Sequence, residues 1–307
     1  MKTIVVKKQS KVNCLSKALE LIDEGGTVIV FPGKYEEKLK IKKSNIKIIG
    51  FDPVNTIITF HDYAQKIHED GKEFNTFRTY SLMLYGDNIE LKNLTIENSS
   101  GPGKLVGQAV ALHTLGDNLK ISNCILKAHQ DTIFLGPLPD DLRERYQGFL
   151  PKDELIGINN ARILFENSTI IGDVDFIFGS ANAMFSGCRI ISRGPGYVAA
   201  PSTASDQEFG ITFLNCTFEG TGEENTYLAR PWRNYGKAVF IDCFYHNHIK
   251  EEGFHNWEAG RENTCRFYEY NCRYHNGTDF KRVDYLKKLT AKEREIYSIE
   301  TFFNQRG

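Results

Sequence analysis

Two aspartates in the middle of the chain stand at equivalent places in a short repeated phrase. Asp131 follows Asn123 by eight residues, and Asp175 follows Asn167 by the same interval. If the copies of the phrase stack in register as parallel strands, the two carboxyl groups lie on neighbouring strands, about 4.8 Å apart. Like charges so close are unfavourable, so one carboxyl should keep its proton while the other ionises. Such a pair can supply an acid together with a base or nucleophile.

The residues beside the two aspartates favour a reactive pair over two solvated surface residues, which is the alternative interpretation. Asp131 follows Gln130, and Asp175 is followed by the largely apolar run 176–179, which indicates partial burial. Because a buried carboxylate is costly unless it is paired, a partly buried aspartate is expected to have a partner or a function.

A third segment could complete the site with a cation and an aromatic ring. Arg230 and Trp232 flank a proline. A guanidinium can hold an ionised aspartate in a bidentate pair, and a tryptophan beside a charged groove can stack on a sugar ring. The alternatives are a weak surface ion pair for Arg230 and a core aromatic for Trp232.

The elements that must position these residues are short strands in a repeat. Each copy has an alternating apolar run, then Asn, Gly or Asp, and then a small residue. Asn and Gly tolerate the left-handed backbone of a corner, and stacked Asn side chains can hydrogen-bond between coils. The spacings of 20 to 30 residues, with one of 44, indicate a solenoid, with a β-sandwich as the alternative. The corner positions are Asn93, Asn123, Asn167, Gly187, Asn215 and Asp242.

Both ends and one insertion depart from the repeat. The periodicity predicts a helix over 13–24, with Asn13 as its N-cap, that covers the open end of the solenoid. Residues 284–297 also show a helical pattern. The segment 137–152 is rich in proline and charge, and it is predicted to loop out of the solenoid. We therefore expect one all-β domain over 1–307, with that insertion loop.

Composition narrows the class of protein. The 307 residues are 41% hydrophobic with a net charge of −1, which does not favour nucleic-acid binding, and no apolar run suggests a membrane span. The seven cysteines are scattered without a CxxC pair, so a zinc site is not expected. We expect the thiols to be reduced. With no signal peptide visible at the start, we expect a cytoplasmic monomer. The alternative is a secreted protein whose leader is absent from this sequence.

Taken together, these segments resemble the pectin methylesterase family, in particular its bacterial-type members, from about residue 28 to 303. Five motifs occur in the family's order. They are residues 33–37 (GKYEE, for GxYxE), 108–112 (QAVAL), 130–132 (QDT), 175–179 (DFIFG) and 230–232 (RPW).

The resemblance implies a right-handed parallel β-helix and a carboxylic ester hydrolase that removes methyl groups from pectin or methylated oligogalacturonides. It implies Asp175 as nucleophile and Asp131 as general acid and then base. It also implies Gln130 as oxyanion donor and Arg230 as the residue that orients Asp175, with no metal and no cofactor. The residues implied to contact substrate are Gln108, Trp232, Ser81 and Phe178.

Some positions depart from the family's pattern, which leaves the substrate subsites open. Ala229 replaces the usual glycine before Arg230, and Asp173 adds a carboxylate where the family usually has threonine. The rival functions are a β-helix lyase or glycosidase that cuts the pectin backbone, and an inactive carbohydrate-binding solenoid. The 137–152 loop and the expected cytoplasmic location predict a preference for short methylated oligomers over long pectin.

Overall fold

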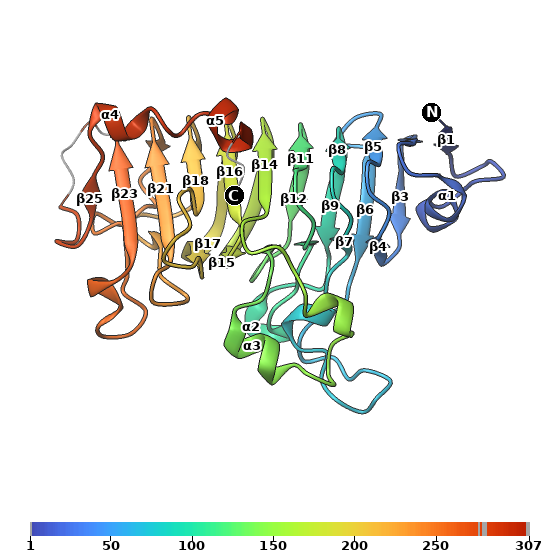
Figure 1. Ribbon diagram of the computed structural model, residues 1–307, viewed down its shortest axis with the longest axis horizontal. Coiled ribbons are helices and arrows are strands. Elements are labelled where there is room, and N and C mark those ends of the chain that lie inside the picture. The colour runs from blue at the N-terminus through green and yellow to red at the C-terminus, as the bar shows by residue number, and fades with distance from the viewer. Residues whose placement is uncertain (1, 276, 278–280, 305–307) are drawn as a thin grey trace.

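The chain is a parallel β-helix in which coils of short strands stack along one axis (Figure 1). The computed structural model describes residues 2–275, 277 and 281–304. One face of the solenoid is a sheet to which successive coils each add one strand, and all of its strand pairs are parallel. The predicted β-helix is thus confirmed. Its strands, in spatial order, are β1 (Thr3–Val6), β2 (Thr27–Val30), β5 (Lys47–Gly50), β8 (Glu90–Lys92), β11 (Leu119–Ser122), β14 (Arg162–Glu166), β16 (Asn182–Ser186), β18 (Ile211–Leu214), β21 (Lys237–Ile241), β23 (Arg266–Tyr270) and β25 (Lys287–Lys288).

The second sheet forms the remaining sides of the coils. Two long strands, β15 (Thr169–Gly179) and β17 (Arg189–Pro201), belong to both of its branches. Strand β15 pairs through its first half with β12 (Ile125–Lys127) and through its second half with β13 (Ile133–Leu135). One branch contains β3 (Gly33–Glu36), β6 (Thr56–Phe60), β9 (Thr95–Asn98), β12 (Ile125–Lys127), β15 (Thr169–Gly179), β17 (Arg189–Pro201), β19 (Thr217–Gly220), β22 (Phe244–Tyr245) and β24 (Arg273–Tyr274). The other adds β4 (Leu39–Ile41), β7 (Leu82–Leu84), β10 (Leu112–Thr114), β13 (Ile133–Leu135) and β20 (Thr226–Ala229).

The corner residues take the backbone that the repeat requires. All six corner positions have a positive φ, between 48° and 61°. Side-chain amides also bridge neighbouring coils: Asn123 donates to Asn93 at 2.7 Å, and Asn271 donates to Asp242 at 2.6 Å. Because each bond spans adjacent turns of the solenoid, the corners help to fix the register in which the strands stack.

The interior is filled by columns of like side chains. Four phenylalanine rings stack from coil to coil with centroids 4.4, 5.1 and 4.9 Å apart, and they give the core a continuous apolar spine. A column of buried or half-buried cysteines runs beside the corners, and all seven cysteines are free thiols. The phenylalanines are Phe165, Phe185, Phe213 and Phe240. The column contains Cys124, Cys188, Cys216, Cys243 and Cys272, with Ser168 between Cys124 and Cys188.

At the N-terminal end, a helix forms where one was predicted, but it is shorter and capped differently. Helix α1 spans Leu15–Leu21 with Cys14 as its N-cap, so the prediction of Asn13 as cap was wrong. The first free N–H groups are instead satisfied from a distance, because the Glu37 carboxylate accepts from the backbone N–H of Leu15 and Ser16 at 2.8 and 2.9 Å. A local cap was therefore unnecessary.

At the C-terminal end, helices form as the pattern over 284–297 predicted, but they begin later than residue 284. Residues 287–288 form β25, which extends the first sheet beside β23, so the exposed sheet edge overrides the helical pattern. Two short helices follow, α4 (Ala291–Arg294) and α5 (Ile299–Asn304). This segment runs back over the first sheet (Figure 1), where Phe302 packs edge-on against Phe209 with ring centroids 5.1 Å apart.

The segment after β13 leaves the coil and carries helix α3 (Asp140–Arg145), while helix α2 (Gly103–Val106) lies before β10. Figure 1 shows both helices projecting on the same side of the solenoid. The part of the chain that the structure describes also contains three 3₁₀ turns: η1 (Thr76–Arg78), η2 (Lys152–Glu154) and η3 (Arg261–Asn263). Among the described residues, no helix is long and apolar enough to cross a membrane.

Candidate active site

The two aspartates lie in register on adjacent coils. Ile133 in β13 pairs with Ile177 in β15, an offset of 44 residues that also separates Asp131 from Asp175. The backbone N–H of Asp131 donates to the carbonyl oxygen of Val174 at 3.0 Å, which joins the two turns directly. Both aspartates have a positive φ, 64° and 48°. The same left-handed turn is thus repeated on neighbouring coils at the two acidic positions.

Both aspartates open into a cleft of about 490 Å³ on the outer surface of the β-helix. The cleft collects side chains from several coils, from η1, from α3 and from the loops after β20. Its lining residues are Asn75, Thr76, Phe77, Gln108, Gln130, Asp131, Asp141, Leu142, Arg145, Tyr146, Asp175, Phe178, Ala200, Arg230, Trp232, Arg233 and Trp257.

Arg230 holds the Asp175 carboxylate with both of its oxygens engaged. The Nε and Nη2 atoms donate at 2.8 and 2.5 Å, the bidentate geometry that sequence reasoning anticipated. The guanidinium itself lies between two aromatic rings, with its carbon 3.7 Å from the centroid of Tyr197 and 3.9 Å from that of Trp257. Cation–π contacts on both faces leave the arginine little freedom, so the orientation of Asp175 is fixed in turn.

The environment separates the charge states of the two carboxyl groups. Burial raises the pKa of Asp131 well above its usual range, and the nearby charges of Asp175 and Asp173 raise it further. Burial also raises the pKa of Asp175, but there the hydrogen bonds and charge of Arg230 oppose the shift directly. Asp131 therefore keeps its proton at a pH where Asp175 is ionised.

Two glutamines line the cleft beside the aspartates. The backbone N–H of Ala109 donates to the carbonyl oxygen of Gln130 at 3.1 Å, which ties the segment of Gln108 to that of Gln130. Helix α2 packs closely on the Gln130 side chain: a Cβ at Gly103 would lie 2.6 Å from its Oε1. The glycine therefore allows α2 to press the Gln130 amide into place.

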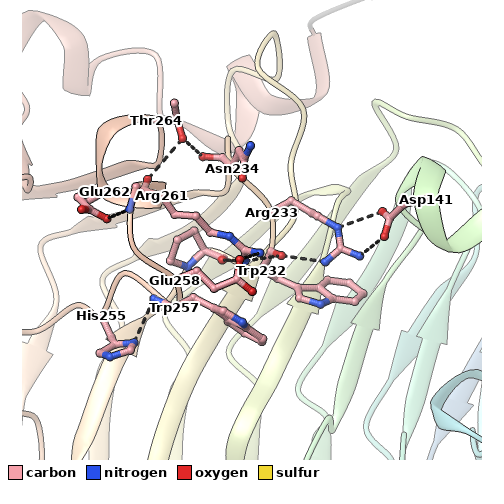
Figure 2. A network of polar contacts seen from close by, with 12 residues as sticks. Asp141, Trp232, Arg233, Asn234, His255, Trp257, Glu258, Arg261, Glu262 and Thr264 are labelled. Carbon is pink, nitrogen blue, oxygen red and sulfur yellow. Dashed lines mark hydrogen bonds and ion pairs between the residues drawn. The ribbon is translucent and has the colours of Figure 1, made fainter.

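The loop that presents Trp232 is fastened by polar contacts (Figure 2). Nη1 of Arg261 donates to the carbonyl oxygens of Pro231 and Trp232 at 2.8 and 2.9 Å. The Trp232 ring meets that of Phe178 nearly at right angles, with centroids 5.6 Å apart. Both rings line the cleft, where sequence reasoning placed them, and they give it one apolar wall.

Ser81 does not reach the cleft, so its assignment to the substrate-contacting set was wrong. Its side chain is fully buried, and its hydroxyl donates to the carbonyl oxygen of Glu97 at 2.7 Å. The residues of this region that do line the cleft are Asn75, the N-cap of η1, and Thr76 and Phe77 within it. The turn at 76–78 swings them outward, whereas Ser81 directly precedes the buried strand β7.

Sequence reasoning missed the two rings that enclose Arg230. Tyr197 could have been found from the register, because it pairs with Val174 beside Asp175. Trp257 lies in an irregular loop before η3 and carries no local signal. Its backbone has φ 63°, and its N–H donates to Nδ1 of His255 at 3.1 Å.

A polar chain braces the turns that hold the aspartates. Nδ1 of His129 lies 2.9 Å from a carboxylate oxygen of Asp173, and its Nε2 lies 2.9 Å from Arg193. Since the arginine can only donate, Nε2 is the acceptor, and Nδ1 carries the proton shared with Asp173. Asp173, the departure noted in the sequence, thus fixes the turn before Asp175 to the turn before Asp131.

Within the described ranges, no group of three or more His, Cys, Asp or Glu side chains is placed to hold a metal ion. The polar centre of the cleft consists of carboxyl, amide and guanidinium groups. Such a set can supply a nucleophile, a proton and hydrogen-bond donors to an ester carbonyl.

Comparison with known proteins finds one family throughout. The pectinesterase family pattern matches residues 3–138 and 150–306. The chain is 33% identical over 276 residues to pectinesterase QRT1 of Arabidopsis thaliana. That alignment covers 87% of this chain and 66% of the relative's length. The fold is similar to that of pectin methylesterase PemA from Erwinia chrysanthemi, with a TM-score of 0.80 and 20% identity, covering 100% of this chain and 97% of that one. A pectin methylesterase solved in complex with a hexasaccharide is similar too, with a TM-score of 0.79, 21% identity and coverage of 100% and 98%.

Proposed function

Because the chain belongs to the pectinesterase family, we propose that it is a carboxylic ester hydrolase that removes methyl groups from methyl-esterified galacturonate chains and releases methanol. The chain spans 66% of the length of the first relative. The proposal therefore rests on the residues that line the cleft of this chain as well as on the family. The cleft has the size and the mixed polar and aromatic lining that a short run of sugar residues requires.

One observation carries the proposal: two buried carboxyl groups stand on adjacent coils, and only one of them is held by a guanidinium. Arg230 orients Asp175 and opposes the rise in its pKa, while burial and the neighbouring carboxylates raise the pKa of Asp131 well above its usual range. A nucleophile and an acid therefore coexist at one pH within one cleft.

Acylation begins when a carboxylate oxygen of Asp175 attacks the carbonyl carbon of the ester. The carbonyl oxygen becomes an oxyanion, which an amide N–H of Gln130 meets with Gln108 nearby. One such donor contributes about 3 kcal/mol to the transition state in other enzymes. The tetrahedral intermediate collapses, the methoxy oxygen takes the proton of Asp131, and methanol leaves. The product is an anhydride between Asp175 and the galacturonate carboxyl group.

Deacylation uses the same residues with Asp131 in the opposite role. Asp131, now ionised, removes a proton from water as the water oxygen attacks the acyl carbon of the anhydride. The bond to Asp175 breaks, Asp175 leaves as a carboxylate, and the free galacturonate acid remains. Asp131 is protonated again, so the cycle closes. Dividing the reaction at a covalent intermediate replaces one difficult step with two easier ones.

The proposal is tested by incubating the purified protein with methyl-esterified oligogalacturonide and measuring methanol over time. We expect steady release that depends on enzyme concentration. No methanol from a folded protein, over a range of pH and chain length, would overturn the proposed function.

Chelators are expected to leave the activity unchanged. In the proposed mechanism, an amide N–H meets the developing oxyanion and Arg230 is the charge partner of Asp175. Protein dialysed against EDTA should therefore release methanol at the rate of the untreated protein. Loss of activity that calcium or zinc restores would contradict this mechanism.

We further propose a preference for short methylated oligomers over polymeric pectin. Helix α3 lines the cleft, and its Asp141 forms a bidentate ion pair at 3.0 and 2.7 Å with Arg233, which follows β20 (Figure 2). A wall adds contacts to a short chain but obstructs a long one, so the effect should appear in kcat/KM. We expect a higher kcat/KM per methyl ester on oligomers than on pectin.

Shortening the 137–152 loop should narrow that difference between oligomer and polymer. Leu142 and Tyr146 are buried in an aromatic cluster with Phe77 and Phe134, so the shortened variant must first be shown to fold by circular dichroism. An equal or higher kcat/KM on pectin in the intact protein would refute the preference.

A cytoplasmic, monomeric enzyme that meets imported oligomers fits these proposals. The seven thiols are free, which suits a reducing compartment. Cell fractionation tests the location, and light scattering coupled to size-exclusion chromatography tests the oligomeric state. Recovery in the extracellular fraction would overturn the proposed location.

A further inference from the structure

Part of the cleft wall comes from a segment outside the family pattern. The two matched ranges end at 138 and resume at 150, and the residues between them contain α3. Four side chains from this segment line the cleft: Asp141, Leu142, Arg145 and Tyr146. These four side chains therefore lie outside the motifs that the chain shares with its relatives. Any contact that they make with substrate is specific to this chain.

Helix α3 is held firmly over the cleft. Leu142 and Tyr146 are buried in the aromatic cluster below it. The hydroxyl of Tyr146 donates to Oδ1 of Asn75 at 3.0 Å, and Asp141 forms an ion pair with Arg233, which also lines the cleft. Arg145 stands one turn after Asp141, on the helix face that lines the cleft. The backbone of Arg145 is thus held in place, while its exposed side chain can reach a ligand in the cleft.

Arg145 carries a positive charge that nothing in the described part of the chain neutralises by contact. Each of the other arginines that line the cleft is engaged: Arg230 with Asp175 and Arg233 with Asp141. Arg145 makes no hydrogen bond or ion pair with a described residue; its guanidinium carbon lies 5.8 Å from the centroid of the Tyr146 ring. A planar guanidinium without a partner is suited to bidentate binding of a carboxylate.

We propose that Arg145 determines specificity by binding the free carboxylate of a uronic acid residue that adjoins the methyl-esterified residue at the aspartates. This inference rests on the proposed function. The ester group that reacts is neutral and cannot pair with a guanidinium, whereas each unesterified galacturonate residue carries one negative charge. Partly de-esterified chains therefore gain a contact that fully esterified chains lack.

The test compares fully methyl-esterified trigalacturonate with the three isomeric dimethyl esters, each of which carries one free carboxylate. For each, kcat/KM is measured by methanol release. We expect wild-type protein to favour at least one mono-acid isomer. In Arg145→Ala and Arg145→Gln, the ratio of kcat/KM for that isomer to kcat/KM for the full ester should fall about three- to tenfold, as expected for a charge-assisted contact at a partly exposed site. Arg145→Lys, which keeps the charge without the fork, should fall less.

Arg143→Ala is the matched control. Arg143 lies on the same short helix, pairs with Asp140 and does not line the cleft. Its removal changes the net charge equally and should leave the ratio as in wild type. An unchanged ratio in both Arg145 variants would overturn the inference alone, as would an equal fall in Arg143→Ala, which would indicate a general effect of charge. Absence of methanol from every substrate with wild-type protein would overturn the proposed function and the inference with it.

Discussion

Asp175→Asn should reduce methanol release about 10⁴-fold or more. The amide nitrogen and oxygen of asparagine cannot attack the ester as a carboxylate does, and the covalent route is then closed. Without the nucleophile no anhydride can form. The general acid and the oxyanion donors remain, but they have no intermediate to act on. The measurement is methanol release at high enzyme concentration, with the variant and wild type prepared in parallel.

The Asp175→Asn protein should remain folded, which separates a chemical effect from a structural one. The amide oxygen can still accept from Arg230, and that guanidinium stays between Tyr197 and Trp257. The circular dichroism should therefore resemble that of wild type. The amide nitrogen cannot accept from the second guanidinium donor, so the melting temperature should fall. Methanol release near the wild-type rate from a well-folded variant would show that Asp175 is not the nucleophile.

Asp131→Asn should lower kcat by about 10²–10⁴-fold, the usual contribution of general acid–base catalysis. The departing methoxide then lacks its proton, and the water of deacylation lacks its base. In wild type, kcat/KM should fall as the pH rises through the raised pKa of Asp131, because acylation needs the protonated form. Asparagine does not titrate, so this alkaline limb should disappear from the variant's profile. A wild-type rate in Asp131→Asn would move the acid role to another residue.

The same substitution should stabilise the fold at neutral pH. Burial and the charge of Asp175 raise the pKa of Asp131 in the folded state above its unfolded value. Between these two values the folded state binds more protons than the unfolded state, so the free energy of unfolding falls as the pH rises. A neutral amide removes this penalty, and the melting temperature of Asp131→Asn at pH 7 should exceed that of wild type. A lower melting temperature would argue that Asp131 is stabilised in its ionised form.

The sequence allowed the pairing of the aspartates to be predicted because a repeat converts spacing into geometry. The corner residues Asn123 and Asn167 set the phase, and Asp131 and Asp175 occupy the same position after them. Once strands stack in register, no further information is needed to bring these two side chains together. The bidentate contact from Arg230 followed from its chemistry and from the family resemblance.

What the sequence did not reveal depends on contacts between distant segments. Glu37 caps α1 in place of Asn13, and the edge of a sheet turns residues 287–288 into a strand. Trp257 reaches Arg230 from an irregular loop whose path no periodicity describes. Ser81 was assigned by its position after a motif, but the turn at 76–78 decides which side chains face the cleft.

Ester hydrolysis is tested most simply by the product stoichiometry of one reaction on methyl-esterified oligogalacturonide. Methanol, new carboxylic acid, new reducing ends and unsaturated sugar are measured together with wild-type protein. We expect one methanol for each new acid group, with no new reducing ends and no unsaturated product. New reducing ends without methanol would identify a glycosidase, unsaturated ends would identify a lyase, and tight binding without any product would identify a binding protein; each would contradict ester hydrolysis by Asp131 and Asp175.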